Sequence, residues 1–355
     1  MLEFRDKSTT QDLIKEIEKI NSRENIRIMH VCGTHEMTIV RWGLRKLLPK
    51  NIKLICGPGC PVCVTSASEI DFAVKLVKEK EVILTTFGDM FRVPGTILSL
   101  SEVKSQGADV RIIYGIDEAI KIARKTDKEV IHFSIGFETT APSIAAEILE
   151  NQTLKNFSII CSHRIIPPAM KYILSCKDIE INGFICPGHV STIIGCDPYK
   201  ILAKKFVKPM VISGFEPNDV LLSVLIILRQ IKNKESKAEN EYNRVVKNKG
   251  NIIAQKIINN VFEICDKGWR GIGTIPNSGL KLKNKFAKFD AEKRFGIKIK
   301  KSQDIKPGCK CGEIMKGKAM PQDCPYFGKS CIPENPTGAC MVSIEGACYI
   351  AYNYS

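Results

Sequence analysis

Three cysteines, Cys56, Cys60 and Cys63, stand within eight residues of one another, directly after an apolar run. Cys60 and Cys63 are separated by a proline and a valine, so their sulfur atoms can meet within one turn. Such a pair either cycles between a dithiol and a disulfide or holds a soft metal ion. Ser66 and Glu69 have the spacing of a capping box, which predicts that a helix follows. The alternative is that these thiols are small buried side chains that pack a turn.

Cys32 forms a second reactive group with His35 and Glu36, at the end of the first apolar run of the chain. A thiolate, an imidazole and a carboxylate this close in sequence could converge on one metal ion or one proton pathway. His30 and His132 lie within apolar runs instead, and we expect both in the core.

The C-terminal part of the chain contains a third cysteine group. Its six members fall within 40 residues: Cys309, Cys311, Cys324, Cys331, Cys340 and Cys348. Zinc sites favour two short C-x₂₋₄-C pairs, whereas twelve residues separate Cys311 from Cys324 here. A [4Fe–4S] cluster accepts wider spacing because its four irons present four separate corners. The spacing therefore favours an iron–sulfur cluster, in a loop-rich cage ordered mainly by its metal.

Composition limits the class of protein. With 355 residues, of which 44% are hydrophobic, the chain is long enough for two or three domains with proper interiors. It contains no run of about 20 apolar residues and no signal-peptide core near Met1, so we expect a cytoplasmic protein that does not enter a membrane. In a reducing compartment the 15 cysteines do not form a disulfide framework. We expect purely structural roles for the cysteines outside the three groups: Cys161, Cys176, Cys186, Cys196 and Cys265.

The net charge of +15 raises the question of nucleic acid binding. Between Asp266 and Lys310 there are 13 Lys and Arg residues against 4 Asp and Glu, with Phe286, Phe289 and Phe295 interleaved. No RNA-binding motif accompanies this region. We therefore expect a solvated basic face, suited to docking an acidic partner, and no nucleic acid.

Strand-length apolar runs alternate with helical patterns, which predicts an α/β fold of parallel sheets with covering helices. The expected strands are at 26–31, 52–55, 82–85, 110–114, 130–135, 157–161, 183–186 and 210–213. Helical patterns stand out at 9–20, 220–232 and 252–264. We expect two similar open parallel-sheet modules of four strands each, with a break near residue 116, followed by a loop-rich C-terminal iron–sulfur region. The predicted domains are 1–116, 117–265 and 266–355.

Most reactive side chains follow the ends of these strands, where ligands bind in open α/β sheets. Besides the two N-terminal groups, Glu138, His163 and His189 occupy such positions. The glycines at 57 and 59 do not form a phosphate loop, because neither G-x-x-x-x-G-K-[ST] nor G-x-G-x-x-G is present. The sequence thus favours thiol and metal chemistry over nucleotide binding.

Four motifs occur together: C-G-T-H-E at 32–36, G-P-G-C-P-V-C at 57–63, G-F-E-T-T-A-P at 136–142 and C-M-V-S-I-E-G-A-C at 340–348. With this set the chain resembles the HypD family of [NiFe]-hydrogenase maturation factors over nearly its full length. The resemblance implies a scaffold that binds iron and on which the Fe(CN)₂CO group of the hydrogenase is assembled. From the resemblance we also expect this scaffold to be a monomer within a complex with a HypC-type chaperone. Cyanide would come from a HypE-type partner, itself supplied by a HypF-type carbamoyltransferase.

The resemblance also assigns residues. Iron binding and thiol redox work fall to Cys32, His35, Cys60 and Cys63, with Cys32 as the iron ligand, and the iron is a transient Fe(II) that carries CN and CO. The family's [4Fe–4S] cluster maps to Cys311, Cys324, Cys331 and Cys348, with Cys340 as a substitute for one of them. Whether such a chain is an enzyme or a scaffold with redox activity is left open.

A free-standing thiol-disulfide oxidoreductase, in which the cluster reduces Cys60–Cys63, is the alternative function. In the scaffold hypothesis, the Cys32 and Cys60–Cys63 loops lie at the open ends of strands and cannot enclose an ion alone. We therefore expect a partner protein to close a cleft between the two modules, which Glu138, His163 and His189 would line.

Overall fold

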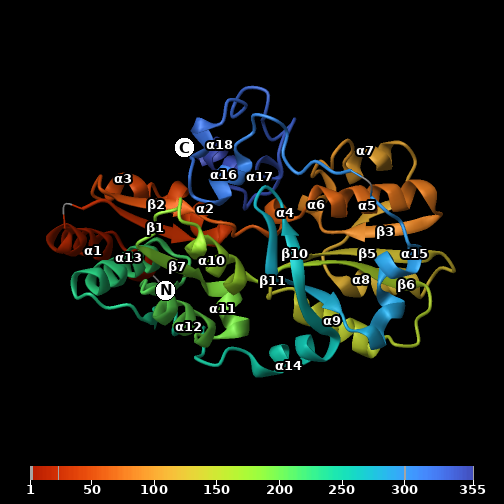
Figure 1. The fold of residues 1–355 in the computed structure, drawn as a ribbon, viewed down its shortest axis with the longest axis horizontal. Helices are drawn as coiled ribbons and strands as arrows, with labels where there is room; N and C mark the ends of the chain where they lie inside the picture. Colours follow the sequence, from red (N-terminus) through yellow and green to blue (C-terminus); the bar gives the residue numbers. More distant parts are fainter. Residues whose placement is uncertain (1–2, 23, 300, 355) are drawn as a thin grey trace.

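The computed structural model describes residues 3–22, 24–299 and 301–354. Figure 1 shows two lobes side by side, each built on a parallel sheet, with a long hairpin between them and the C-terminal helices over one end of both. The architecture is the α/β class that the alternating pattern predicts.

Strands and helices follow one another along most of the chain. The strands are β1 (Ile26–His30), β2 (Ile52–Cys56), β3 (Val82–Thr86), β4 (Val110–Ile112), β5 (Glu129–Gly136), β6 (Phe157–His163), β7 (Gly183–Pro187), β8 (Met210–Ser213), β9 (Ala238–Asn240), β10 (Phe262–Trp269) and β11 (Gly273–Leu282). The helices of the first half are η1 (Glu3–Arg5), α1 (Lys7–Ile20), α2 (Gly33–Arg41), α3 (Leu44–Leu47), α4 (Pro61–Val64), α5 (Ala67–Glu79), α6 (Gly88–Phe91), α7 (Leu100–Ser105), α8 (Ile116–Ala123), α9 (Ala141–Glu150) and α10 (Ile166–Ser175). Those of the second half are α11 (Gly188–Ile194), α12 (Asp197–Phe206), α13 (Pro217–Lys232), α14 (Ile252–Val261), η2 (Asn284–Phe289), α15 (Ala291–Phe295), α16 (Cys311–Met315), η3 (Pro321–Asp323), α17 (Ala339–Val342) and α18 (Ala347–Tyr354). Each of the eight strands expected from the sequence is present, with its ends shifted by at most two residues.

The first sheet has five strands in the order β2-β1-β7-β8-β9, all parallel. The second has four in the order β4-β3-β5-β6, also all parallel. In both sheets the first strand along the chain pairs with the second on one side and the third on the other. Such an order creates a switch point beside the first strand, where open α/β sheets bind ligands.

The division of strands between the sheets differs from the prediction. We expected each module to use four consecutive strands, but β3 to β6 form one sheet and are inserted between β2 and β7 of the other. A boundary near residue 116 separates β4 from β5, which belong to the same sheet. The correction has a physical reason: apolar periodicity locates strands, whereas their neighbours are chosen by which helix faces and loops can pack together.

The antiparallel hairpin β10–β11 was not predicted. The helical pattern at 252–264 ends earlier than expected, at Val261, because Phe262 to Trp269 continue as a strand. The hairpin runs between the lobes in Figure 1 and reaches β6 through a bridge between Arg164 and Gly279. The expected boundary at 265 therefore falls inside β10.

Each sheet is covered on both faces by apolar clusters. In the second sheet, Phe133 belongs to the cluster on one face and Phe157 to that on the other. Phe286 and Phe289 of the basic segment are buried in the latter cluster, so their rings do not lie on a nucleic acid-binding surface. No helix within the described residues is long and apolar enough to cross a bilayer.

Candidate metal and thiol-redox site

Cys32 lies at the switch point of the first sheet, between the end of β1 and the start of α2. Its backbone is extended and caps the helix, and its side chain is only 7% exposed. Burial, followed by the nearby Glu345 carboxyl, raises the pKa of the Cys32 thiol to about 11. The resting group is therefore a neutral thiol that must lose a proton to bind a metal ion.

Cys60 and Cys63 form a disulfide at the start of α4, with their Cα atoms 5.2 Å apart. Both are buried. Their loop lies directly against Cys32, because the Gly33 N–H donates to the Gly59 carbonyl over 3.2 Å. A Cβ atom on Gly59 would stand 2.1 Å from the Cys32 nitrogen, so only glycine permits this approach. The two thiol groups predicted from the sequence are thus neighbours.

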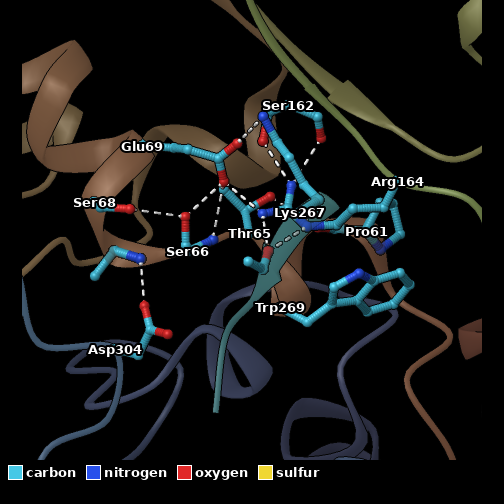
Figure 2. A network of polar contacts seen from close by, with 12 residues as sticks. Pro61, Thr65, Ser66, Ser68, Glu69, Ser162, Arg164, Lys267, Trp269 and Asp304 are labelled. Atoms are coloured by element: carbon cyan, nitrogen blue, oxygen red, sulfur yellow. Dashed lines mark hydrogen bonds and ion pairs between the residues drawn. The ribbon is translucent and has the colours of Figure 1, made fainter. Parts of the chain in front are cut away.

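A buried network of ions fixes the helix that follows the disulfide (Figure 2). The Glu69 carboxylate accepts hydrogen bonds from the backbone and hydroxyl of Ser66, which confirms that this pair forms the expected helix start. The same carboxylate pairs with Arg164 over 2.5 Å and Lys267 over 3.0 Å. Burial alone would raise the pKa of Glu69, but these two cations hold it well below its usual range. The network joins α5, the end of β6 and β10, so it fixes the helix that follows the disulfide to the second sheet and to the hairpin.

The six C-terminal cysteines gather in one place. The Sγ atoms of Cys340 and Cys348 are 3.3 Å apart. A Cβ atom on Gly338 would lie 3.6 Å from the Cys309 sulfur and 3.8 Å from the Cys340 sulfur. Of the six, all but Cys309 are buried. Cys309 also interacts electrostatically with Cys311, Cys324 and Cys331. All six cysteines therefore lie near one another, and their arrangement does not by itself show which four would hold a cluster.

The cysteine cluster adjoins the disulfide. The Cys63 sulfur lies 3.9 Å from the carbonyl oxygen of Ala339, the residue before Cys340. A cavity of about 10 Å³, room for roughly one water molecule, is lined by Cys60, Cys63 and Cys340 together. The disulfide and one of the C-terminal cysteines therefore line one common cavity.

Arg270 is a residue of this site that sequence reasoning missed. Its side chain is 2% exposed, and its backbone N–H donates to the carbonyl of Val64, in the disulfide helix. Nε donates to the Asp304 carbonyl over 2.7 Å, while Nη1 has no hydrogen-bond partner among the described residues. Cys311 and Cys340 both act on the guanidinium electrostatically. A buried cation with a free N–H group beside clustered thiols fits an anionic thiolate-bound cluster.

The C-terminal segment also covers Cys32, which corrects the expectation of an open strand end. A Cβ atom on Gly33 would lie 2.5 Å from the Glu345 side chain, so the α17–α18 loop packs directly on the Cys32 loop. Thr34 donates to the Glu345 carboxylate over 3.3 Å. In the same loop, Ser343 donates to Asp89 of the second lobe over 2.8 Å. The chain itself therefore supplies a wall that we expected from a partner.

His35 is engaged at the end of β8. Its Nε2 bonds to the Gly214 carbonyl over 2.9 Å and its ring stacks on Phe215, 4.8 Å between centroids. Burial, then the neighbouring His30, lowers the pKa of His35 to about 3, so its imidazole is neutral. Nδ1 has no partner among the described residues and is available as an acceptor or ligand atom.

Glu36 does not join Cys32 and His35 as expected. Its carboxylate bonds instead to His30 Nε2 over 2.8 Å and to Arg45 over 2.6 Å. The sequence could not distinguish these partners, because the direction of a side chain in the first helical turn depends on the neighbouring strand.

The residues expected to line a cleft are mostly internal. Glu138 is buried, with Oε1 accepting from the Ile166 N–H over 2.9 Å, and burial raises its pKa to about 7. His163 is fully buried and bonds to Ser134 over 2.8 Å. Of the three, only His189 is exposed. The predicted core histidines, His30 and His132, are fully buried.

Comparison with known proteins agrees with the geometry. The family model HypD, described as the hydrogenase formation hypA family, matches residues 8–355. The chain is 48% identical over 358 residues to a protein of Methanocaldococcus jannaschii named for hydrogenase expression and formation, spanning 100% of this chain and 99% of the relative. It is 45% identical over 364 residues to hydrogenase maturation factor HypD2 of Bradyrhizobium diazoefficiens, and 42% over 363 residues to HypD of Azotobacter vinelandii; each alignment spans 99% of this chain and 96% of the relative.

Proposed function

The chain belongs to the HypD family of hydrogenase maturation factors, and from this premise we propose that it is the scaffold on which the Fe(CN)₂CO group is assembled. Iron(II) is the cargo, and Cys32 is its ligand, with His35 beside it. The observation that carries the proposal is the contact of three thiol groups: Cys32, the Cys60–Cys63 pair and the C-terminal cysteines. A protein that needed only a disulfide would not require a buried third thiol against it.

We propose that Cys311, Cys324, Cys331 and Cys348 hold a [4Fe–4S] cluster. When bound, this cluster supplies electrons one at a time. Arg270 supports the assignment, since its unpartnered N–H group needs an anion in the same buried region. Four thiolates could bind either a cluster or one zinc ion, and the wide spacing of these cysteines in the sequence favours the cluster.

The Cys60–Cys63 pair has a defined redox task in this proposal. A thiocyanate carried on a partner, R–S–CN, releases cyanide only when two electrons are added, giving R–S⁻ and CN⁻. The two thiolates of Cys60 and Cys63 can supply these electrons by forming their disulfide. Because that loop touches Cys32, the cyanide is released beside the iron.

The partners follow from the same chemistry. A HypC-type chaperone would share the iron, and a HypE-type protein, supplied by a HypF-type carbamoyltransferase, would bring the thiocyanate. The protein would work as a monomer within this complex in the cytoplasm, where thiols stay reduced.

Infrared spectroscopy of the anaerobically purified complex tests the proposal. Bands of metal-bound cyanide and carbonyl are expected in the parent and should disappear in Cys32→Ala and Cys63→Ala, with hydrogenase activity lost in a complemented strain. Circular dichroism checks that both variants fold. Absence of the bands in the parent, together with rapid disulfide turnover, would instead indicate a free-standing thiol-disulfide oxidoreductase.

A further inference from the structure

His30, Glu36 and Cys56 converge from three elements behind Cys32. His30 and Cys56 are the last residues of β1 and β2, and they are register partners in the parallel pair. Side chains of such partners project from the same face of a sheet. Glu36 approaches from the first turn of α2. The ligand atoms of the three residues, one nitrogen, one oxygen and one sulfur, all lie within 4.8 Å of one another.

We propose that these three residues form a binding site for a divalent transition-metal ion, separate from Cys32. During maturation the ion would be iron(II) on its way to Cys32, a step that rests on the proposed function. A mixed imidazole, carboxylate and thiolate set suits borderline ions such as iron(II), cobalt(II) and zinc(II) rather than Mg²⁺ or Ca²⁺. With metal–ligand bonds of about 2.0–2.3 Å, the ligand atoms of one ion lie roughly 3–4 Å apart, so small side-chain shifts suffice.

The hydrogen bonds of His30 provide an independent argument. Its Nε2 faces the Glu36 carboxylate at 2.8 Å, and its Nδ1 faces the Cys32 carbonyl oxygen at 3.2 Å. Both partners are acceptors, whereas a neutral imidazole has only one N–H donor. A single neutral tautomer can donate to only one of these two acceptors, and a cation between Nε2 and the Glu36 carboxylate would satisfy the other contact. With an ion there, Nδ1–H still donates to the Cys32 carbonyl, which is how metal-bound histidines are usually oriented.

Two of the three ligands would be anionic, the Glu36 carboxylate and the Cys56 thiolate, because the thiolate is the form of cysteine that binds metal ions. Arg45 donates to both oxygens of Glu36, over 2.6 and 3.1 Å. A carboxylate has about four lone-pair positions, so it can keep this partner and still bind a metal. Arg45 then orients the ligand and balances the two anions.

The position of the site suggests why it would be useful. The Cys32 carbonyl accepts from His30, and Cys56 also lines the small cavity shared with Cys60 and Cys63. An ion held by Cys56 is therefore next to both the cargo thiol and the redox pair. It would be available for transfer without passing through solvent.

Cobalt(II) binding to the full-length, cluster-loaded protein with its disulfide intact tests the site, because the Cys60–Cys63 pair and the four proposed cluster ligands are then occupied. Equilibrium dialysis gives affinity, and the visible absorption of tetrahedral cobalt(II) reports thiolate coordination. The site should bind one ion in the parent, in Cys32→Ser and in the control Cys176→Ser, a half-buried thiol on another element. Cys56→Ser and His30→Gln should weaken binding by more than the roughly 10- to 100-fold typical of losing an outer-shell partner.

The outcomes separate this inference from the proposed function. If cobalt(II) binds Cys56→Ser as tightly as the parent, the site is wrong. Loss in Cys32→Ser with retention in Cys56→Ser would leave Cys32 as the metal ligand of the scaffold and overturn only the second site. Equal loss in both variants would mean a single shared site, which also contradicts the inference. Cobalt(II) should raise the melting temperature of the parent but not of Cys56→Ser.

Discussion

Glu138, a residue of the third sequence motif, has a buried carboxyl group. Its Oε2 has no partner among the described residues, and its pKa is raised by burial from about 4.5 to about 7. The folded state therefore prefers the protonated acid, whereas the unfolded chain ionises near its ordinary pKa. The stabilisation is complete at low pH and is lost as the pH rises through 7.

The isosteric variant Glu138→Gln should remove this dependence. At about 1.36 kcal/mol per pKa unit, the parent should lose about 3 kcal/mol between pH 4.5 and 8, and the variant should not. Urea unfolding at pH 4.5 and 8 measures the difference. If the parent and the variant have equal pH profiles of stability, burial does not raise the pKa of Glu138, and the prediction is wrong.

Arg270 should set the reduction potential of the proposed cluster. Reduction adds negative charge next to the guanidinium, so Arg270→Met should shift the midpoint potential to more negative values. If the substitution changes the equilibrium constant for reduction of the cluster tenfold, the midpoint potential shifts by about 59 mV, since the couple transfers one electron. Arg270→Lys keeps the charge and is the matched control. An anaerobic redox titration followed by electron paramagnetic resonance is the measurement, and an unchanged potential in the methionine variant would place the cluster away from Arg270.

At the scale of elements, the contact between the Cys32 and Cys60–Cys63 loops depends on Gly59. A Cβ atom there would meet the Cys32 backbone at 2.1 Å, so Gly59→Ala should push the loops apart. Overpacking of this kind costs about 1–3 kcal/mol. Gly88→Ala is the control, because its Cβ atom would lie in ordinary contact at 3.7 Å from Ile112.

Two measurements follow for Gly59→Ala: the urea midpoint and iron(II) binding at Cys32. Both should fall in Gly59→Ala and stay near the parent in Gly88→Ala. Normal iron binding in the first variant would mean that the two loops act independently.

The elements also show what sequence reasoning could reach. The strands β1 to β8 and the helix α13 were predicted because long apolar patterns are a local property of the chain, whereas the short strand β9 was not predicted. Sheet membership was not, since it depends on contacts between distant segments, and neither was β10–β11, whose polar residues follow directly after a helix. Likewise the cysteine groups were found from their spacing in the sequence. Arg270, in the turn between β10 and β11, and Glu345, between α17 and α18, lie at the site only because distant segments pack together in the fold.

On the scale of the whole molecule, the C-terminal segment does two things at once. It gathers the six cysteines and it covers Cys32, which is only 7% exposed. In the proposed function iron must reach this thiol, so the cover has to open or a partner has to displace it. The segment around Cys324 and Cys331 is short of regular structure, so its order should depend on the cluster that we propose there.

Loss of the cluster should therefore uncover Cys32. Cys331→Ala should abolish the brown absorbance, lower the iron and sulfide content from about four of each per chain, and increase hydrogen exchange after residue 307. Alkylation of Cys32, followed by mass spectrometry, should become faster by about tenfold or more, the change produced by lowering the opening free energy by about 1.4 kcal/mol.

Cys176→Ala serves as the control for alkylation, since it removes a thiol that lies outside the cluster and should leave the cover closed. If Cys32 stays unreactive after the cluster is lost, the Gly33–Glu345 packing holds the cover by itself. In that case the cover would open only through a contact that competes for the Cys32 loop, and a chaperone that shares the iron would have to displace Glu345 first. Bound zinc without sulfide in the parent would contradict the cluster and leave a structural zinc site as the element that orders the segment.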